Sequence, residues 1–176
     1  MSPLTLHDSA TLRQSKQDRI ADLAADVTAA AIRPGPSVDI YAIHTRPAIL
    51  RRLAALLAEY LPQGVDRLVA TDSDACLVTA VALHSGVPFA LAGTNSGDSI
   101  VLRGDLYPFE RIALVETVPS RWRESIIGQL KAVHNELAVV GTAIHTGPRT
   151  PRRGGVDNRC VYRLSEDGLE PFQEDQ

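Results

Sequence analysis

A carboxylate, two arginines and several hydroxyl side chains follow a short apolar run in the middle of the chain. The run covers residues 112–115 and ends at Glu116, and its length and composition are typical of a buried parallel strand. A polar loop follows, and the apolar spacing of a helix begins near Arg123. Open α/β sheets bind ligands where a strand leads through a loop into a helix N-terminus. Free N–H groups there bind phosphate, and a carboxylate at the strand end binds ribose hydroxyls or Mg²⁺.

This loop is the first candidate ligand site. Its candidate residues are Glu116, Thr117, Ser120, Arg121, Trp122, Arg123, Glu124 and Ser125. We expect Glu116 to face a ligand, and the alternative is that it caps the turn after the strand. Either the two arginines bind phosphate and the indole stacks on a base, or Trp122 fills the pocket and the arginines lie in solvent.

A second strand with carboxylates at its end comes earlier in the chain. We predict a strand over residues 65–70, a helix over 75–84 that Gly86 ends, and a strand over 87–91, which together form a βαβ unit. The loop between the first strand and the helix contains Thr71, Asp72, Ser73 and Asp74. These side chains either cap the following helix or bind a ligand.

The segments before these loops supply part of the scaffold. A helix is expected over residues 10–32, with Ser9 as its cap and a Pro-Gly-Pro sequence at its end. Residues 38–43 alternate like a strand. Pro47 then begins a leucine-rich helix that extends to residue 61.

The segments after these loops complete the prediction. A strand is expected over residues 137–144, and residues 159–164 and 169–172 have the pattern of a hairpin. The predicted units are an N-terminal helical extension (1–36), a core (37–146) and a linker with a C-terminal hairpin (147–176).

Residues 104–118, Gly-Asp-Leu-Tyr-Pro-Phe-Glu-Arg-Ile-Ala-Leu-Val-Glu-Thr-Val, resemble one segment of the type I phosphoribosyltransferases. In that family the segment leads into the loop that binds 5-phosphoribosyl-1-diphosphate (PRPP), and the match is best with the orotate branch. Residues 38–61 also resemble orotate-type enzymes, and the similarity as a whole covers residues 38–145. The resemblance implies an α/β fold with a central, mostly parallel sheet flanked by helices. The N-terminal helix and the C-terminal hairpin are then additions to this core.

The resemblance also shows where the PRPP loop departs from the family. Family members end the strand in two adjacent acids and continue with a turn rich in Thr, Ser and Gly. Here the first acid is present as Glu116, the second is replaced by Thr117, and the turn is replaced by residues 120–125, Ser-Arg-Trp-Arg-Glu-Ser. A tryptophan there hinders the close approach of backbone to phosphate that glycine permits.

Two further regions also lack residues that hold the phosphate groups in the family. The first loop of the family holds magnesium–pyrophosphate, but here Asp72 and Asp74 are followed by Ala and Cys instead of glycines. The mobile hood of orotate-type enzymes is rich in lysine. The corresponding residues 92–103 contain no lysine and a single arginine, Arg103.

These departures lead to three hypotheses about function. The first is a phosphoribosyltransferase-like protein of the orotate type that binds a nucleotide or ribose phosphate and has little or no standard transferase activity. The second is an active glycosyltransferase of nucleotide metabolism with a rebuilt site, in which Arg103, Arg121 and Arg123 replace the lost groups. The third is an interaction protein whose pocket Trp122 closes. The resemblance adds Mg²⁺ as a candidate cofactor and a homodimer as the expected assembly.

Composition limits the other functional classes. The chain has 176 residues and a net charge of −3, so nucleic acid and anionic membranes are not expected partners. Its two cysteines do not form a CxxC motif, which predicts a reducing cytoplasm. No apolar run reaches membrane-spanning length.

The remaining basic and imidazole side chains carry weaker signals. We expect His44 and Arg46 to lie in a surface loop, with contact to a partner subunit's site as the alternative. The basic linker over residues 149–153 is expected to be solvated, or else to contact nucleic acid or an acidic partner. The histidines without metal-ligand spacing are His84, His134 and His145.

Overall fold

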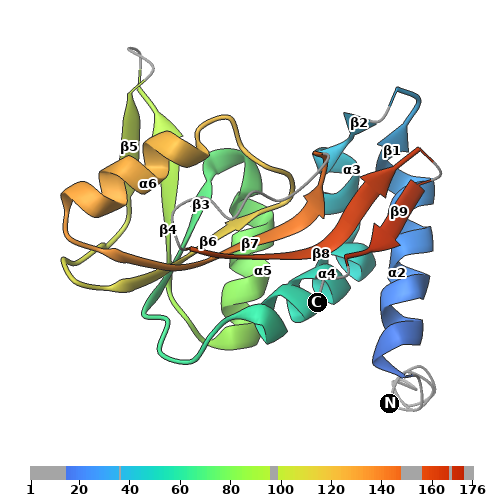
Figure 1. The fold of residues 1–176 in the computed structure, drawn as a ribbon, viewed down its shortest axis with the longest axis horizontal. Coiled ribbons are helices and arrows are strands. Elements are labelled where there is room, and N and C mark those ends of the chain that lie inside the picture. The colour runs from blue at the N-terminus through green and yellow to red at the C-terminus, as the bar shows by residue number, and fades with distance from the viewer. Residues whose placement is uncertain (1–14, 36, 96–98, 148–155, 167, 173–176) are drawn as a thin grey trace, which may run out of the picture.

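The fold is a seven-stranded sheet with helices on both faces (Figure 1). The computed structural model describes residues 15–35, 37–95, 99–147, 156–166 and 168–172. Across the sheet the strands are β5 (Ile100–Arg103), β4 (Phe89–Thr94), β3 (Arg67–Thr71), β6 (Arg111–Glu116), β7 (Glu136–His145), β8 (Asp157–Ser165) and β9 (Gly168–Pro171). The strands from β4 to β8 pair in parallel, and the edge strands β5 and β9 pair antiparallel. The predicted α/β class with a mostly parallel sheet is therefore confirmed.

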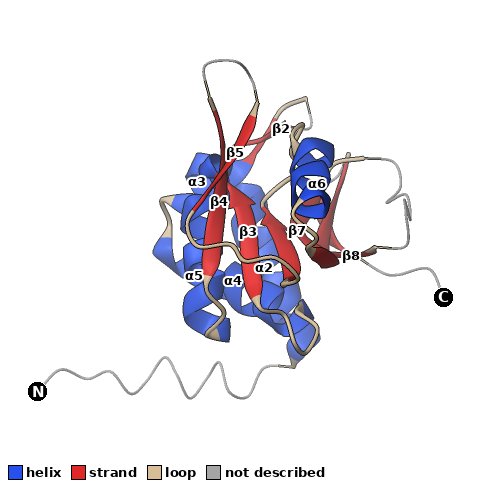
Figure 2. Cartoon of the chain, turned by 90° about the vertical axis from the view of Figure 1, so that its left-hand side faces the viewer, coloured by secondary structure: helices blue, strands red, loops and turns tan. Residues whose placement is uncertain are grey.

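The helices and short strands fill the connections. They are α2 (Lys16–Ala31), β1 (Ile32–Arg33), β2 (Ser37–Val38), α3 (Ile40–His44), α4 (Pro47–Tyr60), the 3₁₀ turn η1 (Asp72–Asp74), α5 (Ala75–Ser85) and α6 (Arg123–Ala132). Figure 2 shows α6 on one side of the sheet and α3, α4 and α5 on the other. None of the helices in the described ranges has the length and apolar character that spanning a bilayer requires.

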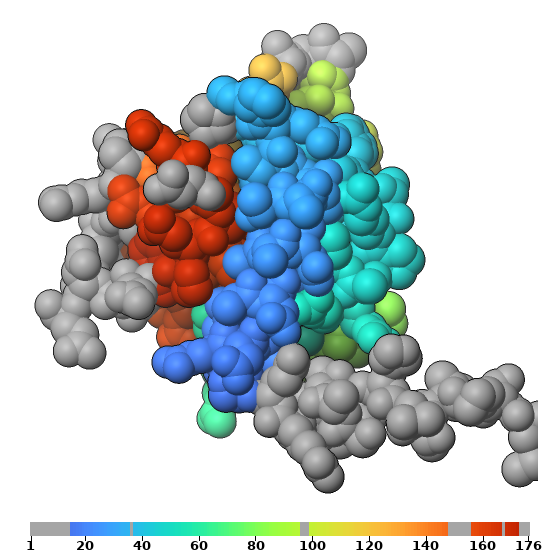
Figure 3. Space-filling model, turned by 90° about the vertical axis from the view of Figure 1, so that its right-hand side faces the viewer, coloured from blue at the N-terminus to red at the C-terminus, as the bar shows by residue number. Residues whose placement is uncertain are grey.

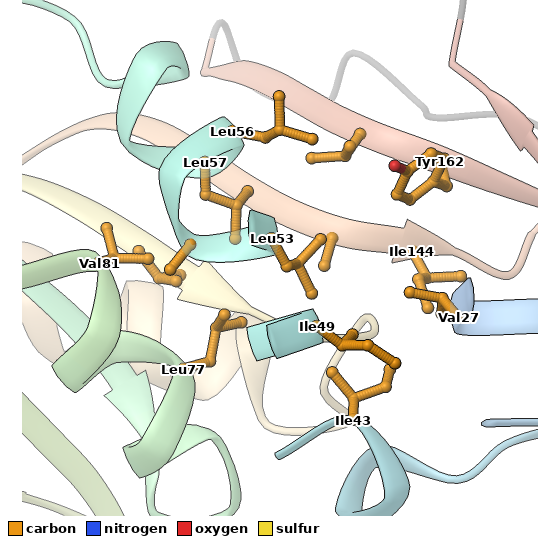
Figure 4. Close-up of a cluster of buried hydrophobic side chains, with 14 of the residues drawn as sticks. Val27, Ile43, Ile49, Leu53, Leu56, Leu57, Leu77, Val81, Ile144 and Tyr162 are labelled. Atoms are coloured by element: carbon orange, nitrogen blue, oxygen red, sulfur yellow. The ribbon is translucent and has the colours of Figure 1, made fainter. Parts of the chain in front are cut away.

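The central strands are apolar on both faces because both faces are covered. Successive side chains of a strand point to opposite sides. Leu68 accordingly packs in the larger core with α2 to α5, whereas Val69 packs in the smaller core under α6. Leu114 and Ile126 also belong to the smaller core. Figure 4 shows part of the larger core, where Leu53 of α4 lies among side chains of the neighbouring elements.

The N-terminal helix and the C-terminal hairpin pack together. Figure 3 shows α2 in blue between the hairpin in red and α4 in cyan. The Tyr162 hydroxyl donates a hydrogen bond of 2.8 Å to the Ile20 carbonyl, and Val27 lies in the larger core with Tyr162. The hairpin is confirmed as β8 and β9, and β8 extends the sheet beside β7.

The first two helices begin differently from the prediction. Ser15 caps α2 through a capping box with Asp18, whereas the predicted cap, Ser9, lies outside the described residues. The predicted strand over 38–43 is wrong, because only β2 is extended and α3 follows it. Asp39 accepts a hydrogen bond from the Ala42 N–H at 3.0 Å, and this cap favours a helical turn over the strand.

Two glycines provide a matched test of the helix that follows each candidate loop. Gly86 ends α5 at φ +73°, where a side chain is strained, whereas Gly128 lies within α6 with open space around it. We expect Gly86→Ala to lower the free energy of unfolding by about 1 kcal/mol. Gly128→Ala should raise the free energy of unfolding by about 0.5–1 kcal/mol. Both effects are measured as shifts of the denaturant midpoint at an unchanged denaturant dependence of the free energy. Equal effects of the same sign would contradict the roles of Gly86 as a left-handed helix end and of Gly128 as an interior helix residue.

Candidate functional site

The candidate loops meet at the carboxyl edge of the sheet. Because β3, β4 and β6 are parallel neighbours, the residues that follow them lie along one edge. The loop after β6 leads into α6, and the loop after β3 leads through η1 into α5. The fold therefore brings the two predicted loops together.

The Glu116 carboxylate is buried and bound by other parts of the protein. Its side chain is 1% exposed. One oxygen, Oε1, accepts hydrogen bonds from the Arg123 guanidinium and from the Thr142 hydroxyl, the latter at 3.0 Å. The other oxygen, Oε2, accepts from the Ser120 N–H at 3.1 Å, so Glu116 does cap the turn after its strand. Thr142 is the register partner of Glu116 on β7.

Thr117 takes part in a second buried cluster, on the opposite side of the loop. Its N–H and its hydroxyl both donate to Asp74 Oδ1, at 3.0 and 2.5 Å. Because this hydroxyl hydrogen is directed at Asp74, the Thr117 oxygen accepts from His44 Nε2 at 2.8 Å. Thr71 donates to Asp74 Oδ2 at 3.0 Å. Thr117 thus ties α3 to the β3–α5 loop.

His44 is buried next to one carboxylate. Burial lowers the pKa of His44, and the nearby Asp74 opposes this effect, with 3.9 Å between His44 Nε2 and Asp74 Oδ1. The prediction of a surface position is wrong for His44, which is 8% exposed, whereas Arg46 is exposed. The sequence gives little sign of the role of His44, because that role depends on a tertiary contact with Thr117.

Asp72 and Arg103 are brought together across β4. Arg103 Nη1 lies 3.1 Å from Asp72 Oδ2, and both side chains are about half exposed. The pair passes over Gly93, where an added Cβ would overlap Asp72 Oδ2. The structure thus joins a predicted pyrophosphate-loop residue to the predicted hood residue, and Gly93 is a third participant that the sequence did not indicate.

The remaining candidates lie just before α6 and in its first turn. Trp122 is partly buried and packs against the smaller core, and the Arg121 guanidinium carbon lies 4.8 Å from the centre of the indole. The Trp122 N–H donates to Ser120 Oγ at 3.1 Å. Arg121 is exposed to solvent, as are Glu124 and Ser125. The N–H groups of a first helical turn have no partner within the helix, so this end suits an anion.

The carboxylates of the site do not fit a resident magnesium ion. Asp74 and Glu116 are buried and already accept hydrogen bonds, and Asp72 is paired with Arg103. Within the described ranges no three His, Cys, Asp or Glu side chains are grouped as metal ligands. A hard cation of this kind requires several free oxygen ligands.

The other histidines lie apart from these loops. His84 is exposed on α5, and His134 stacks on Phe109 at a centroid distance of 5.7 Å. His145 is buried at the end of β7 and meets Phe172 edge to face. The predicted basic linker over 149–153 lies outside the described residues.

The strand order and the helix placement define the type I phosphoribosyltransferase fold. A phosphoribosyltransferase from Corynebacterium diphtheriae superimposes with a TM-score of 0.69 at 17% identity, over 84% of this chain and 96% of that one. Orotate phosphoribosyltransferase from Mycobacterium tuberculosis, solved with inorganic phosphate, gives 0.68 at 16% identity, over 84% and 96%. Adenine phosphoribosyltransferase from Trypanosoma brucei, solved with AMP, pyrophosphate and ribose-5-phosphate, gives 0.66 at 14%, over 93% and 89%. No protein-family profile or curated sequence matches the chain, so the similarity lies in the fold.

The ion pair between Glu116 and Arg123 predicts a large effect on stability. We expect Arg123→Met to lower the free energy of unfolding by about 3 kcal/mol, because it leaves a buried carboxylate without its cation. In the double variant Glu116→Gln/Arg123→Met part of this loss should be recovered. The control, Arg51→Met at an exposed position of α4, should change the free energy by less than about 0.5 kcal/mol. Chemical denaturation measures the free energy of unfolding of each variant. The pairing would be contradicted if the loss in the double variant equalled the sum of the losses in Glu116→Gln and Arg123→Met.

The buried imidazole predicts a dependence of stability on pH. The pKa of His44 is lower in the folded protein. Below the ordinary histidine pKa of about 6.5, the unfolded chain therefore binds more protons than the folded protein. The contribution of His44 to the free energy of unfolding is then complete above that pH. It is lost as the pH falls towards the folded-state pKa, by at most about 1.4 kcal/mol per pH unit. We expect His44→Gln, which keeps an N–H donor for Thr117, to remove this part of the slope between pH 7 and 5. An unchanged slope would show that other groups cause it.

Proposed function

We propose that this protein binds a phosphorylated ligand, a nucleotide or ribose phosphate, at the carboxyl edge of the sheet and has little or no standard phosphoribosyltransferase activity. The burial of the Glu116 carboxylate carries this proposal. A group that is 1% exposed and bound by Arg123, Thr142 and Ser120 does not reach ribose hydroxyls in solvent.

The loss of transfer activity follows from the state of the other carboxylates. Transfer to a base develops charge on the sugar and on the departing pyrophosphate, and its rate depends on groups that are free to stabilise this charge. Asp74 is held by Thr71 and Thr117, and Asp72 is paired with Arg103. Removing a single well-placed group costs roughly 100- to 1,000-fold in rate, so the combined loss leaves little of the reaction.

Ligand binding is supported by the groups that stay accessible. Arg121 is exposed at the N-terminus of α6, and Arg103 is about half exposed. Guanidinium groups and a helix N-terminus both favour phosphate. The similar structures were solved with inorganic phosphate, or with AMP, pyrophosphate and ribose-5-phosphate, which makes these molecules the rational probes. In this proposal the protein is a cytoplasmic homodimer and acts as a sensor or regulator, and Mg²⁺ arrives only with the ligand.

The packing of Trp122 favours a second candidate, an interaction protein with a closed pocket. The indole contacts the smaller core and carries Arg121 on its face, so the side chain fills space that a turn of small residues leaves open. In that case no phosphorylated ligand binds at this edge.

Thermal unfolding with added ligand tests the proposal. We expect PRPP or a ribonucleotide at 100 times its dissociation constant to stabilise the protein by about 2.7 kcal/mol. Arg121→Gln should weaken this stabilisation by removing a charge at the phosphate position. Lys131→Gln, the same loss of charge at the other end of α6, is the matched control.

The outcomes separate the candidates. Stabilisation by nucleotide, with no product from PRPP and a panel of bases, supports the proposal. Magnesium-dependent turnover instead identifies an active enzyme with a rebuilt site. A folded sample that responds to none of these molecules points to the interaction protein.

A further inference from the structure

Asp72 and Arg103 form a contact between the turn that follows β3 and the edge strand β5. They are 31 positions apart in the sequence, and Arg103 Nη1 lies 3.1 Å from Asp72 Oδ2. Asp72 begins the turn after β3, whereas Arg103 ends the antiparallel edge strand β5. The pair therefore spans the strand between them, β4.

The backbone of β4 is shaped to admit this pair. A Cβ on Gly93 would overlap Asp72 Oδ2 and lie 3.0 Å from Arg103 Cζ. Any other residue at this position would push the two side chains apart. Gly93 thus permits the carboxylate and the guanidinium to meet directly over the end of the strand.

The pair is weak enough to be exchanged. The side chains of Arg103 and Asp72 are 58% and 47% exposed, and ion pairs of this kind contribute little net stability. A phosphate group binds a guanidinium through two parallel, charge-assisted hydrogen bonds. An incoming phosphate can therefore displace a carboxylate that is held only by an exposed contact.

We propose that Asp72 is a built-in competitor that masks Arg103, and that a phosphate or diphosphate group binds at this edge by taking its place. This inference rests on the proposed function, because it assumes that a phosphorylated ligand reaches the edge. Asp72 acts mainly by neutralising the Arg103 guanidinium, and its direct repulsion of an approaching anion is the smaller effect. The carboxylate then lowers the affinity of the site instead of contributing to it.

Calorimetric titration with inorganic pyrophosphate, without a divalent cation, tests the competition. We expect Asp72→Asn to bind about fivefold more tightly than the natural protein, which corresponds to about 1 kcal/mol. Arg103→Gln should bind more weakly. The double variant should match Arg103→Gln, because Asp72 acts on the anion mainly through Arg103.

Asp157→Asn is the matched control. It removes the same charge from another exposed pair, which Asp157 forms with Arg159 at 2.7 Å. This pair lies at the start of β8, at the amino ends of the parallel strands, whereas the candidate site lies at their carboxyl ends. Its affinity should equal that of the natural protein, which separates a local effect from a change of net charge. Unchanged thermal unfolding of each variant confirms that the fold is retained.

The outcomes distinguish this inference from the proposed function. Tighter binding by Asp72→Asn alone supports the competition, including the case in which only this variant binds. Equal or weaker binding by Asp72→Asn, with clear binding by the natural protein, overturns the competition and leaves the proposed function in place. No binding by any variant, with pyrophosphate or with nucleotides, overturns both.

Discussion

The buried ion pair between Glu116 and Arg123 is the constraint on which the site depends. A carboxylate without solvent must have a cation and hydrogen-bond donors, because its desolvation is otherwise too costly. Arg123 supplies the charge from α6, and Thr142 and Ser120 supply two further donors. The pair therefore fixes the start of α6 against the end of β6, and it holds the Glu116 carboxylate inside the protein.

The residue after Glu116 imposes the matching constraint on the other side of the loop. Thr117 is fully buried, and it connects His44 on α3 to Asp74 in the loop before α5. The two adjacent residues thus point into two separate polar clusters. Together they tie the loop to both layers of helices.

The scaffold does not depend on the residues of the candidate site. The alternation of Leu68 and Val69 between the two cores holds the sheet between its helical layers. Neither core needs an acid at residue 116 or a glycine-rich turn after it. A chain can therefore keep the phosphoribosyltransferase fold at 14–17% identity to the similar structures while its exposed chemistry changes, since fold and function are set by different residues.

The sequence alone determined the apolar strands at the centre of the sheet and most helix ends, because these follow from local periodicity and from residues such as Pro47 and Gly86. The mostly parallel sheet was implied by the resemblance to a known family. The parallel pairing of β3 and β6 in the structure brings the two predicted loops to one edge, since parallel strands share their carboxyl ends. The sequence did not determine α3, where the cap at Asp39 outweighed an alternating pattern. Only the tertiary structure decided the partners of the charged residues. Whether Glu116 meets a ligand or Arg123, and whether Asp72 meets Arg103, depends on distances between elements far apart in the chain, which periodicity does not encode.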